Sequence, residues 1–209
     1  LTELAQKEAL HFDLVETHRN EMAMLPYTSG TTENPKAVVH THNWFYAHLQ
    51  VAPKVWLDIQ EGDLVWATAA PGWQKWVWSP FVSTLGMGAT AFVYSGRFDA
   101  EKYLQLLQDF KINVLCCTPT EYRFMAKLKN LDQFDLSALR SAVSAGEPLN
   151  AQVVDTFEQY FGLTVRDGYG QTENTLIVGT LPGMKVKKGS MGKPVPGYRV
   201  DIINEKGEV

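Results

Sequence analysis

The sequence predicts an α/β fold in which the sheet layers are covered by helices. Strand-like and helix-like patterns alternate over most of the 209 residues, as expected for a sheet with helical connections. Apolar residues make up 45% of the chain, which is enough to bury a sizeable core in one domain or in two closely packed subdomains. Helix-start signals also follow directly after several apolar runs.

The N-terminal half is expected to begin with two short strands, 22–26 and 37–39, that flank a polar loop. Thr41 can cap a helix that runs to about residue 56. Further strands are expected at 63–68 and 89–94. Asp99 can cap the next helix, because Leu104, Leu107 and Phe110 then lie on one face of it.

The C-terminal half repeats this alternation. A buried strand at 113–117 precedes Thr118-Pro119-Thr120-Glu121, a capping box with proline at the first helical position, and this helix is expected to end near residue 129. A strand at 139–144 precedes a helix capped by Asn150, which ends near 161 with Gly162 in a left-handed conformation. A strand at 163–166, a glycine- and proline-rich loop or hairpin at 181–197 and a final strand at 199–203 complete the prediction.

Composition and charge exclude several classes of function. The net charge of −4 and the absence of a basic block argue against nucleic acid or an anionic membrane as the main partner. No apolar run is long enough to span a membrane, and residues 1–7 lack the pattern of a signal peptide, so a cytoplasmic protein is expected. The two cysteines, Cys116 and Cys117, are adjacent within a predicted buried strand and indicate no disulfide framework.

The segment 27–36 has the chemistry of a polyphosphate-binding loop. It contains four hydroxyl side chains in Thr28, Ser29, Thr31 and Thr32, together with Gly30 and Lys36. Hydroxyl and backbone N–H groups donate to phosphate oxygens, and a lysine adds a compact positive charge. Pro35 and Ala37 exclude a Walker A motif, which requires glycine and Ser/Thr at these positions. Such runs also occur in ordinary surface turns, so this segment alone leaves both interpretations open.

Two further glycine-bearing turns, at 144–148 and 167–173, follow predicted strands. Loops after the strands of an α/β sheet converge on one crevice, where ligands bind. The second turn combines an aromatic ring, a hydroxyl and an acid, which suit base stacking, phosphate contact and a divalent cation.

Taken together, these motifs resemble the AMP-forming acyl-CoA synthetases of the acyl-adenylate-forming superfamily, in the medium-chain and acetyl-CoA synthetase-like branch. The resemblance rests on ordered segments that cover nearly the whole chain: 27–36, 70–73, 119–123, 146–148, 169–173 and 189–197. It implies that the chain is the central part of a large N-terminal adenylation domain of αβαβα type, incomplete at both ends. It further implies an enzyme that joins a carboxylic acid to ATP and passes the acyl group to CoA, using Mg²⁺.

The resemblance also implies roles for individual residues. Thr28, Ser29, Gly30, Thr31, Thr32 and Lys36 would bind the β- and γ-phosphates. The adenine would lie among Gly146, Glu147, Pro148, Asp167, Gly168, Tyr169, Gly170 and Gln171, with Asp167 accepting from its amine and Tyr169 covering one face. Thr172 would contact the α-phosphate and Glu173 would hold Mg²⁺, so Thr172, Glu173 and Lys36 form the expected catalytic group.

The sequence departs from the family pattern in two places that bear on substrates. Glu33 and Ala37 stand where the phosphate loop of the family carries glycine, and a carboxylate at 33 is expected to weaken ATP binding. Acetate-specific members carry tryptophan where this chain has Gly170, so a short branched, medium-chain or aromatic acid is expected. The tryptophans Trp73, Trp76 and Trp78 either line this acyl pocket or belong to an ordinary core.

Several alternatives stay open from the sequence. The ribose-binding aspartate and the lysine-bearing C-terminal domain of the family are not found within these residues, so the chain alone is expected to adenylate poorly or not at all. A domain that loads a carrier protein and a non-catalytic nucleotide- or acyl-binding module remain possible functions. His40 and His42 have no third ligand of suitable spacing, so capping and packing explain them better than a metal site.

Overall fold

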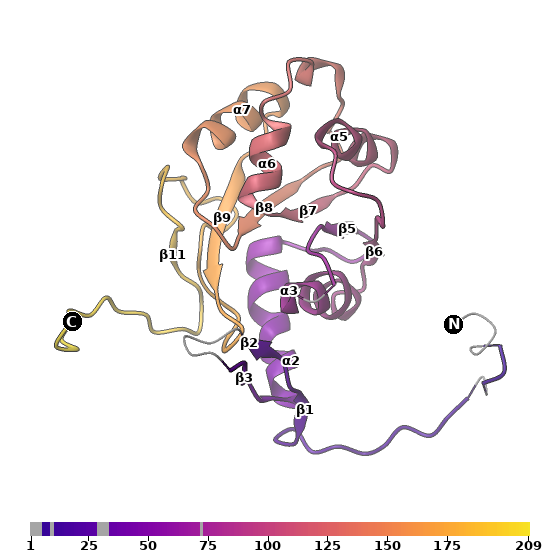
Figure 1. Cartoon of the computed structure of the whole chain (residues 1–209), viewed down its shortest axis with the longest axis vertical. Coiled ribbons are helices and arrows are strands. Elements are labelled where there is room, and N and C mark those ends of the chain that lie inside the picture. Colours follow the sequence, from indigo (N-terminus) through magenta and orange to yellow (C-terminus); the bar gives the residue numbers. More distant parts are fainter. Residues whose placement is uncertain (1–5, 9–10, 29–33, 72) are drawn as a thin grey trace.

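The computed structural model describes residues 6–8, 11–28, 34–71 and 73–209, and it confirms the α/β fold around one mixed sheet (Figure 1). In spatial order the sheet contains β11 (Lys193–Pro194), β10 (Leu176–Gly179), β9 (Val165–Gly170), β8 (Ser141–Ala145), β7 (Val114–Cys117), β5 (Leu64–Ala67) and β6 (Thr90–Phe92). The strands from β9 to β6 are parallel, whereas β10 and β11 add antiparallel strands at one edge.

Helices cover both faces of this sheet. They are α2 (His42–Val51), η1 (Ala52–Leu57), α3 (Gln74–Trp76), η2 (Val77–Ser83), α4 (Thr84–Gly86), α5 (Ala100–Asp109), α6 (Pro119–Met125), η3 (Leu131–Gln133) and α7 (Ala151–Phe161). In Figure 1, α5, α6 and α7 lie on one side of the strands, and α2 and α3 lie on the other. The segments η1 and η2 are π-helical, and each contains a proline.

The parallel strands are buried on both faces, because successive residues point into different cores. In β7, Leu115 and Cys117 pack with α5, α6 and α7, while Val114 and Cys116 pack with η1. Both cysteines are free and buried, as the sequence predicts. The adjacent pair therefore divides between the two cores of the sheet.

Capping residues determine where the helices above the sheet begin and end. Thr118 and Glu121 form the expected capping box with Pro119 at the first position, although α6 ends at Met125 rather than near 129. Asn150 accepts a hydrogen bond from the backbone of Gln152 at 2.8 Å, and Gly162 ends α7 in the left-handed region.

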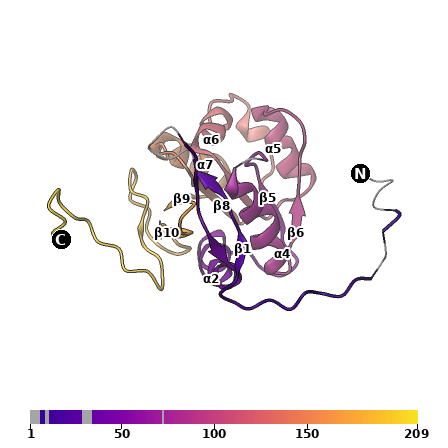
Figure 2. The same cartoon turned by 60° about the horizontal axis from the view of Figure 1, so that its bottom comes forward.

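Two small antiparallel pairs precede the sheet. The strand β1 (Met22–Met24) pairs with β4 (His40–Thr41), and β2 (Tyr27–Thr28) pairs with β3 (Lys36–Ala37). Thr41 occupies the N-cap position of α2, but its side chain makes no capping hydrogen bond. Figure 2 shows the N- and C-terminal segments leaving the body of the domain in opposite directions.

Further expectations from the sequence require correction, and one helical segment was missed. Residues 199–203 form no strand; Ile202 and Ile203 are exposed, and a strand without a paired neighbour has no ladder to stabilise it. The strand β9 continues to Gly170, so the first part of the predicted turn at 167–173 is extended and pairs with β10, which the sequence did not predict. The helical segment 74–86 was likewise not predicted. Phe110 lies at the end of α5 and is half exposed, unlike the buried Leu104 and Leu107.

Candidate nucleotide-binding site

The carboxyl ends of β5, β7, β8 and β9 lie side by side at one edge of the sheet. The register places Ala67 beside Cys116, Cys117 beside Ser144, and Ala145 beside Gly168. The connection after β5 runs through η2 on the face of α2, whereas the connections after β7 and β8 run through α6 and α7 on the other face. The carboxyl ends of the neighbouring strands β5 and β7 therefore form a topological switch point, where open α/β sheets bind ligands.

The predicted phosphate loop lies between the strands of the β2–β3 hairpin. Thr28 and Lys36 are cross-strand partners, which places a hydroxyl and an ammonium group together at its base. Lys36 is exposed. Four of the predicted phosphate ligands lie outside the described residues: Ser29, Gly30, Thr31 and Thr32. Glu33 also lies outside them.

The turn after β8 carries Gly146, Glu147 and Pro148. Gly146 has a φ of 108°, in the region that favours glycine, and this explains its place directly after the strand. The carboxylate of Glu147 accepts a hydrogen bond from the hydroxyl of Thr120 at 2.7 Å, and Arg123 donates to the same hydroxyl at 2.7 Å. These bonds tie the turn to the start of α6, so the two predicted family segments are neighbours.

The end of β9 carries the residues predicted to surround adenine. Asp167 is buried, and its carboxylate accepts hydrogen bonds from the backbone N–H groups of Gly168 at 2.8 Å and Leu149 at 3.4 Å. Burial raises the pKa of Asp167, and these two hydrogen bonds oppose the rise. Tyr169 is 38% exposed, so its ring is available for stacking at this edge.

Helix α2 and the strand β4 that precedes it hold the turn that carries Thr172 and Glu173. His40, Trp44 and His48 are four residues apart along the chain. The ring Nε2 of His40 is 2.7 Å from the Thr172 carbonyl, and the indole N–H of Trp44 donates to the Asn174 carbonyl at 2.9 Å. We call His40, Trp44 and His48 the α2 ladder, because three contacts at this spacing hold one turn along its length.

The third contact of the α2 ladder is fully buried. His48 Nδ1 is 2.6 Å from the Thr175 hydroxyl, and Nε2 is 2.9 Å from the Ser83 hydroxyl. Burial lowers the pKa of His48 to about 4, and the nearby His40 contributes to this shift. His48 is therefore neutral at pH 7. The packing role expected for His40 fits its place here, and the described residues contain no cluster of three potential metal ligands.

The donor set suits the Mg²⁺ that the family resemblance implies. Glu173 is exposed at the turn, and Thr172 beside it is half buried. Mg²⁺ commonly binds proteins through one or two carboxylates and takes its remaining ligands from water and substrate phosphates. A single carboxylate here fits a cation that arrives with a nucleotide.

A link between β5 and β7 at the switch point was not predicted. The hydroxyl of Thr68, directly after β5, donates to Glu121 at 2.6 Å, while the same carboxylate oxygen accepts from the backbone of Thr118 at 2.7 Å. Glu121 of the capping box therefore also links the start of α6 to the residue that follows β5. The α2 ladder was not predicted either, although its four-residue spacing is visible in the sequence.

Two observations bear on the predicted acyl pocket. A Cβ atom at Gly170 would lie 2.2 Å from the Thr175 carbonyl oxygen, so close approach of β10 gives this glycine a steric reason independent of acyl selectivity. Trp73 is 71% exposed, whereas the Trp78 ring packs against Trp44 with centroids 5.0 Å apart. The preference for an acid longer than acetate stays a prediction.

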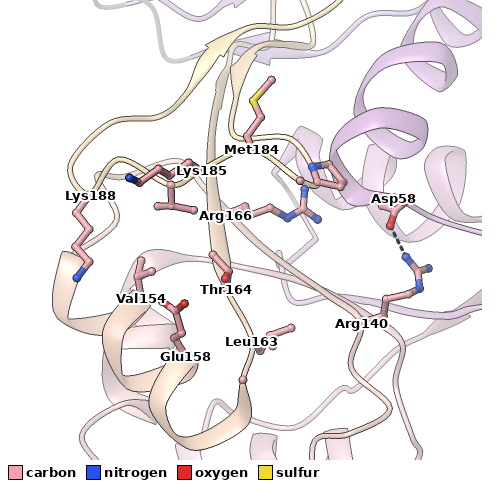
Figure 3. Close-up of a pocket in the computed structure, with 14 residues that line it drawn as sticks. Asp58, Arg140, Val154, Glu158, Leu163, Thr164, Arg166, Met184, Lys185 and Lys188 are labelled. Atoms are coloured by element: carbon pink, nitrogen blue, oxygen red, sulfur yellow. Dashed lines mark hydrogen bonds and ion pairs between the residues drawn. The ribbon is translucent and has the colours of Figure 1, made fainter.

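A cavity of about 690 Å³ lies at the amino ends of the strands, opposite the proposed nucleotide site (Figure 3). Its lining includes Leu163 and Thr164, which precede β9, and Arg140, which precedes β8. Arg140 forms a salt bridge with Asp58, while the buried Arg166 donates to the Trp56 carbonyl at 2.6 Å. These side chains join the amino ends of the strands to η1, and the residues predicted to bind nucleotide are not among the lining.

Comparison with known proteins agrees with this geometry. The chain matches the family described as "AMP-binding enzyme" over residues 2–209. It is 64% identical over 204 residues to the uncharacterized acyl-CoA ligase YtcI of Bacillus subtilis, and 42% identical over 196 residues to the mitochondrial acyl-coenzyme A synthetase ACSM3 of Rattus norvegicus. These alignments cover 98% and 93% of this chain but 39% and 34% of the relatives.

Solved structures show the same fold. The anthranilate CoA ligase AuaEII, crystallised with anthranoyl-AMP, superposes with a TM-score of 0.90 at 29% identity, and an acyl-CoA synthetase from Brucella canis does so with 0.89 at 27% identity. Each alignment covers 99% of this chain and 40% or 38% of the other. The chain therefore spans about two fifths of the length of such relatives. No described helix is long and apolar enough to cross a membrane. By the family match and the shared fold, the chain belongs to the AMP-binding enzyme family.

Proposed function

We propose that the full-length protein is an AMP-forming acid–thiol ligase, which converts a carboxylic acid to its acyl-adenylate with ATP and then transfers the acyl group to CoA. The observation that carries this proposal is the convergence of the segments 146–148, 167–170 and 171–175 at the carboxyl edge of the parallel strands. Relatives named as acyl-CoA ligases support the same reaction class. We also propose that the protein is cytoplasmic.

In this proposal each turn has a defined task. The segment 146–148 and Tyr169 enclose the adenine, and the buried Asp167 accepts from its amine. Thr28 and Lys36, paired at the base of the β2–β3 hairpin, bind the terminal phosphates with the loop between them. Glu173 would hold Mg²⁺, whose charge would offset the repulsion between the substrate carboxylate and the phosphates.

The first half-reaction then proceeds without a covalent enzyme intermediate. A carboxylate oxygen of the acid attacks the α-phosphorus, the bond to the bridging oxygen breaks, and pyrophosphate leaves with the electron pair. The α2 ladder fixes the turn at 172–175 through two backbone carbonyls and the Thr175 hydroxyl, so Thr172 stays aligned with the α-phosphate. The CoA thiol subsequently displaces AMP from the acyl group.

Acid-dependent exchange of labelled pyrophosphate into ATP tests this function in the full-length protein. Hexanoate and benzoate are expected to support exchange better than acetate, and CoA is expected to release AMP and the thioester. Replacing CoA by a phosphopantetheinylated carrier protein as the acyl acceptor separates the loading of a carrier from the synthesis of acyl-CoA. Saturable ATP binding without exchange for any acid would contradict the proposal and indicate a non-catalytic binding module.

A further inference from the structure

Two buried hydrogen-bond donors in the segment α3–η2 have no acceptor among the described residues. They are the ammonium Nζ of Lys75 and the indole Nε1 of Trp78, both of which are shielded from solvent. The two residues are three positions apart in continuous helical backbone, a spacing that places side chains on one side of a helix. One face of α3–η2 therefore presents two unused donors to the interior.

This face lies at the switch point of the sheet. The segment α3–η2 follows β5. Lys75 acts electrostatically on the Asp167 carboxylate and on the Cys117 thiol, so it lies near the carboxyl ends of β9 and β7. The ring centroid of Trp78 is 5.0 Å from that of Trp44, whose indole N–H donates to the turn at 172–175. The two donors thus border the proposed nucleotide site from the side of β5.

An ammonium group that makes no hydrogen bond is costly in a protein interior, because burial removes its hydration and no acceptor atom takes the place of the lost water. The nearby Asp167 carboxylate accepts from the backbone N–H groups of Gly168 and Leu149, and Lys75 is not among its hydrogen-bond partners. The indole N–H of Trp78 adds a second donor of fixed direction. A cation and a neutral donor on the same side of one segment suit a compact anionic oxygen group.

We propose that Lys75 and Trp78 form an oxyanion-binding subsite, which receives either the carboxylate of the acid substrate or a phosphate oxygen of the nucleotide. This inference rests on the proposed ligase function and adds a substrate-binding group contributed by α3–η2. The subsite would hold the reacting anion from the side of β5.

The test uses the full-length protein with Lys75→Met, which removes the charge at similar size, and Trp78→Phe, which removes the N–H and keeps an aromatic ring. The KM for the acid is measured by pyrophosphate exchange, and the dissociation constant for ATP by calorimetry. We expect Lys75→Met to weaken one of these by about tenfold or more, and Trp78→Phe to weaken the same one by a smaller factor. A higher KM for the acid would identify the substrate carboxylate as the bound anion. A higher dissociation constant for ATP would identify a nucleotide phosphate instead.

Thermal unfolding without ligand separates this role from a structural one. Without ligand, removing a buried unpaired charge is expected to raise the Tm of Lys75→Met by about 2 °C or more. With ligand present, the same substitution is expected to abolish the increase in Tm that the bound anion gives. Lys102→Met, at an exposed position of α5, serves as the matched control and should change nothing. A lower Tm or a failure of Lys75→Met to fold would reveal an internal partner for the ammonium and overturn the inference.

Unchanged acid and ATP affinities in Lys75→Met would also overturn it. The proposed function is judged separately in the wild-type protein. If the wild-type protein shows no acid-dependent exchange, the ligase proposal itself fails. If the wild-type protein exchanges normally and both variants match it, the oxyanion subsite alone is wrong.

Discussion

Acidification from pH 7.5 to pH 4 should destabilise the protein through His48. The pKa of this buried imidazole is lowered from its ordinary value of 6.5 to about 4, so between these values the unfolded chain binds a proton that the folded chain does not. The stabilising contribution of neutral His48 is therefore complete above pH 6.5 and is lost as the pH falls. The linkage amounts to about 2 kcal/mol at pH 5 and about 3 kcal/mol at pH 4.

Urea denaturation at a series of pH values measures this effect, with His48→Gln as the reference. Glutamine keeps a donor and an acceptor near Thr175 and Ser83 but does not titrate in this range. Subtracting the two pH profiles of the free energy of unfolding isolates His48 from the carboxylates, which titrate in both proteins. Parallel profiles for wild type and variant between pH 7.5 and 4 would refute the burial argument for His48.

Substitutions at three further positions test the site. Gly170→Ala should lower the free energy of unfolding by about 2 kcal/mol, seen as a lower Tm, because the new Cβ would lie 2.2 Å from the Thr175 carbonyl oxygen; an unchanged Tm would show that β10 can move aside. Tyr169→Ala should weaken ATP binding about tenfold in calorimetry while Tyr169→Phe keeps it, since stacking needs only the ring; equal loss in both would point to the hydroxyl. Glu33→Gly should strengthen ATP binding, because a carboxylate about 4 Å from a phosphate oxygen is repelled by about 4 kcal/mol at an effective dielectric near 20; no gain in affinity or turnover would mean that this side chain does not face the phosphates.

The features that the sequence predicts well are those determined by neighbouring residues. The capping box at Thr118, the cap at Asn150 and the left-handed Gly162 depend on backbone groups only a few positions away. The buried strands β5 and β7 were also predicted, because their apolar runs lie between clear end signals. The fold class follows from the alternation of such elements.

The features that the sequence misses depend on distant partners. The extension of β9 to Gly170 requires its antiparallel neighbour β10, and η2 packs against β5 and α2. The α2 ladder contacts residues about 130 positions away, so its spacing indicates a helix face without revealing what that face holds. Of the candidate site, the segments 146–148 and 167–173 were predicted, but the supporting bonds from Thr68, Thr120 and the α2 ladder were not.

A crystal structure of the full-length protein with ATP and Mg²⁺ would test the central claim most directly. We expect adenine between Tyr169 and the segment 146–148, the metal at Glu173, and the terminal phosphates over Thr28 and Lys36. Nucleotide bound instead in the cavity near Arg140 and Leu163, at the other edge of the sheet, would contradict the assignment of the site.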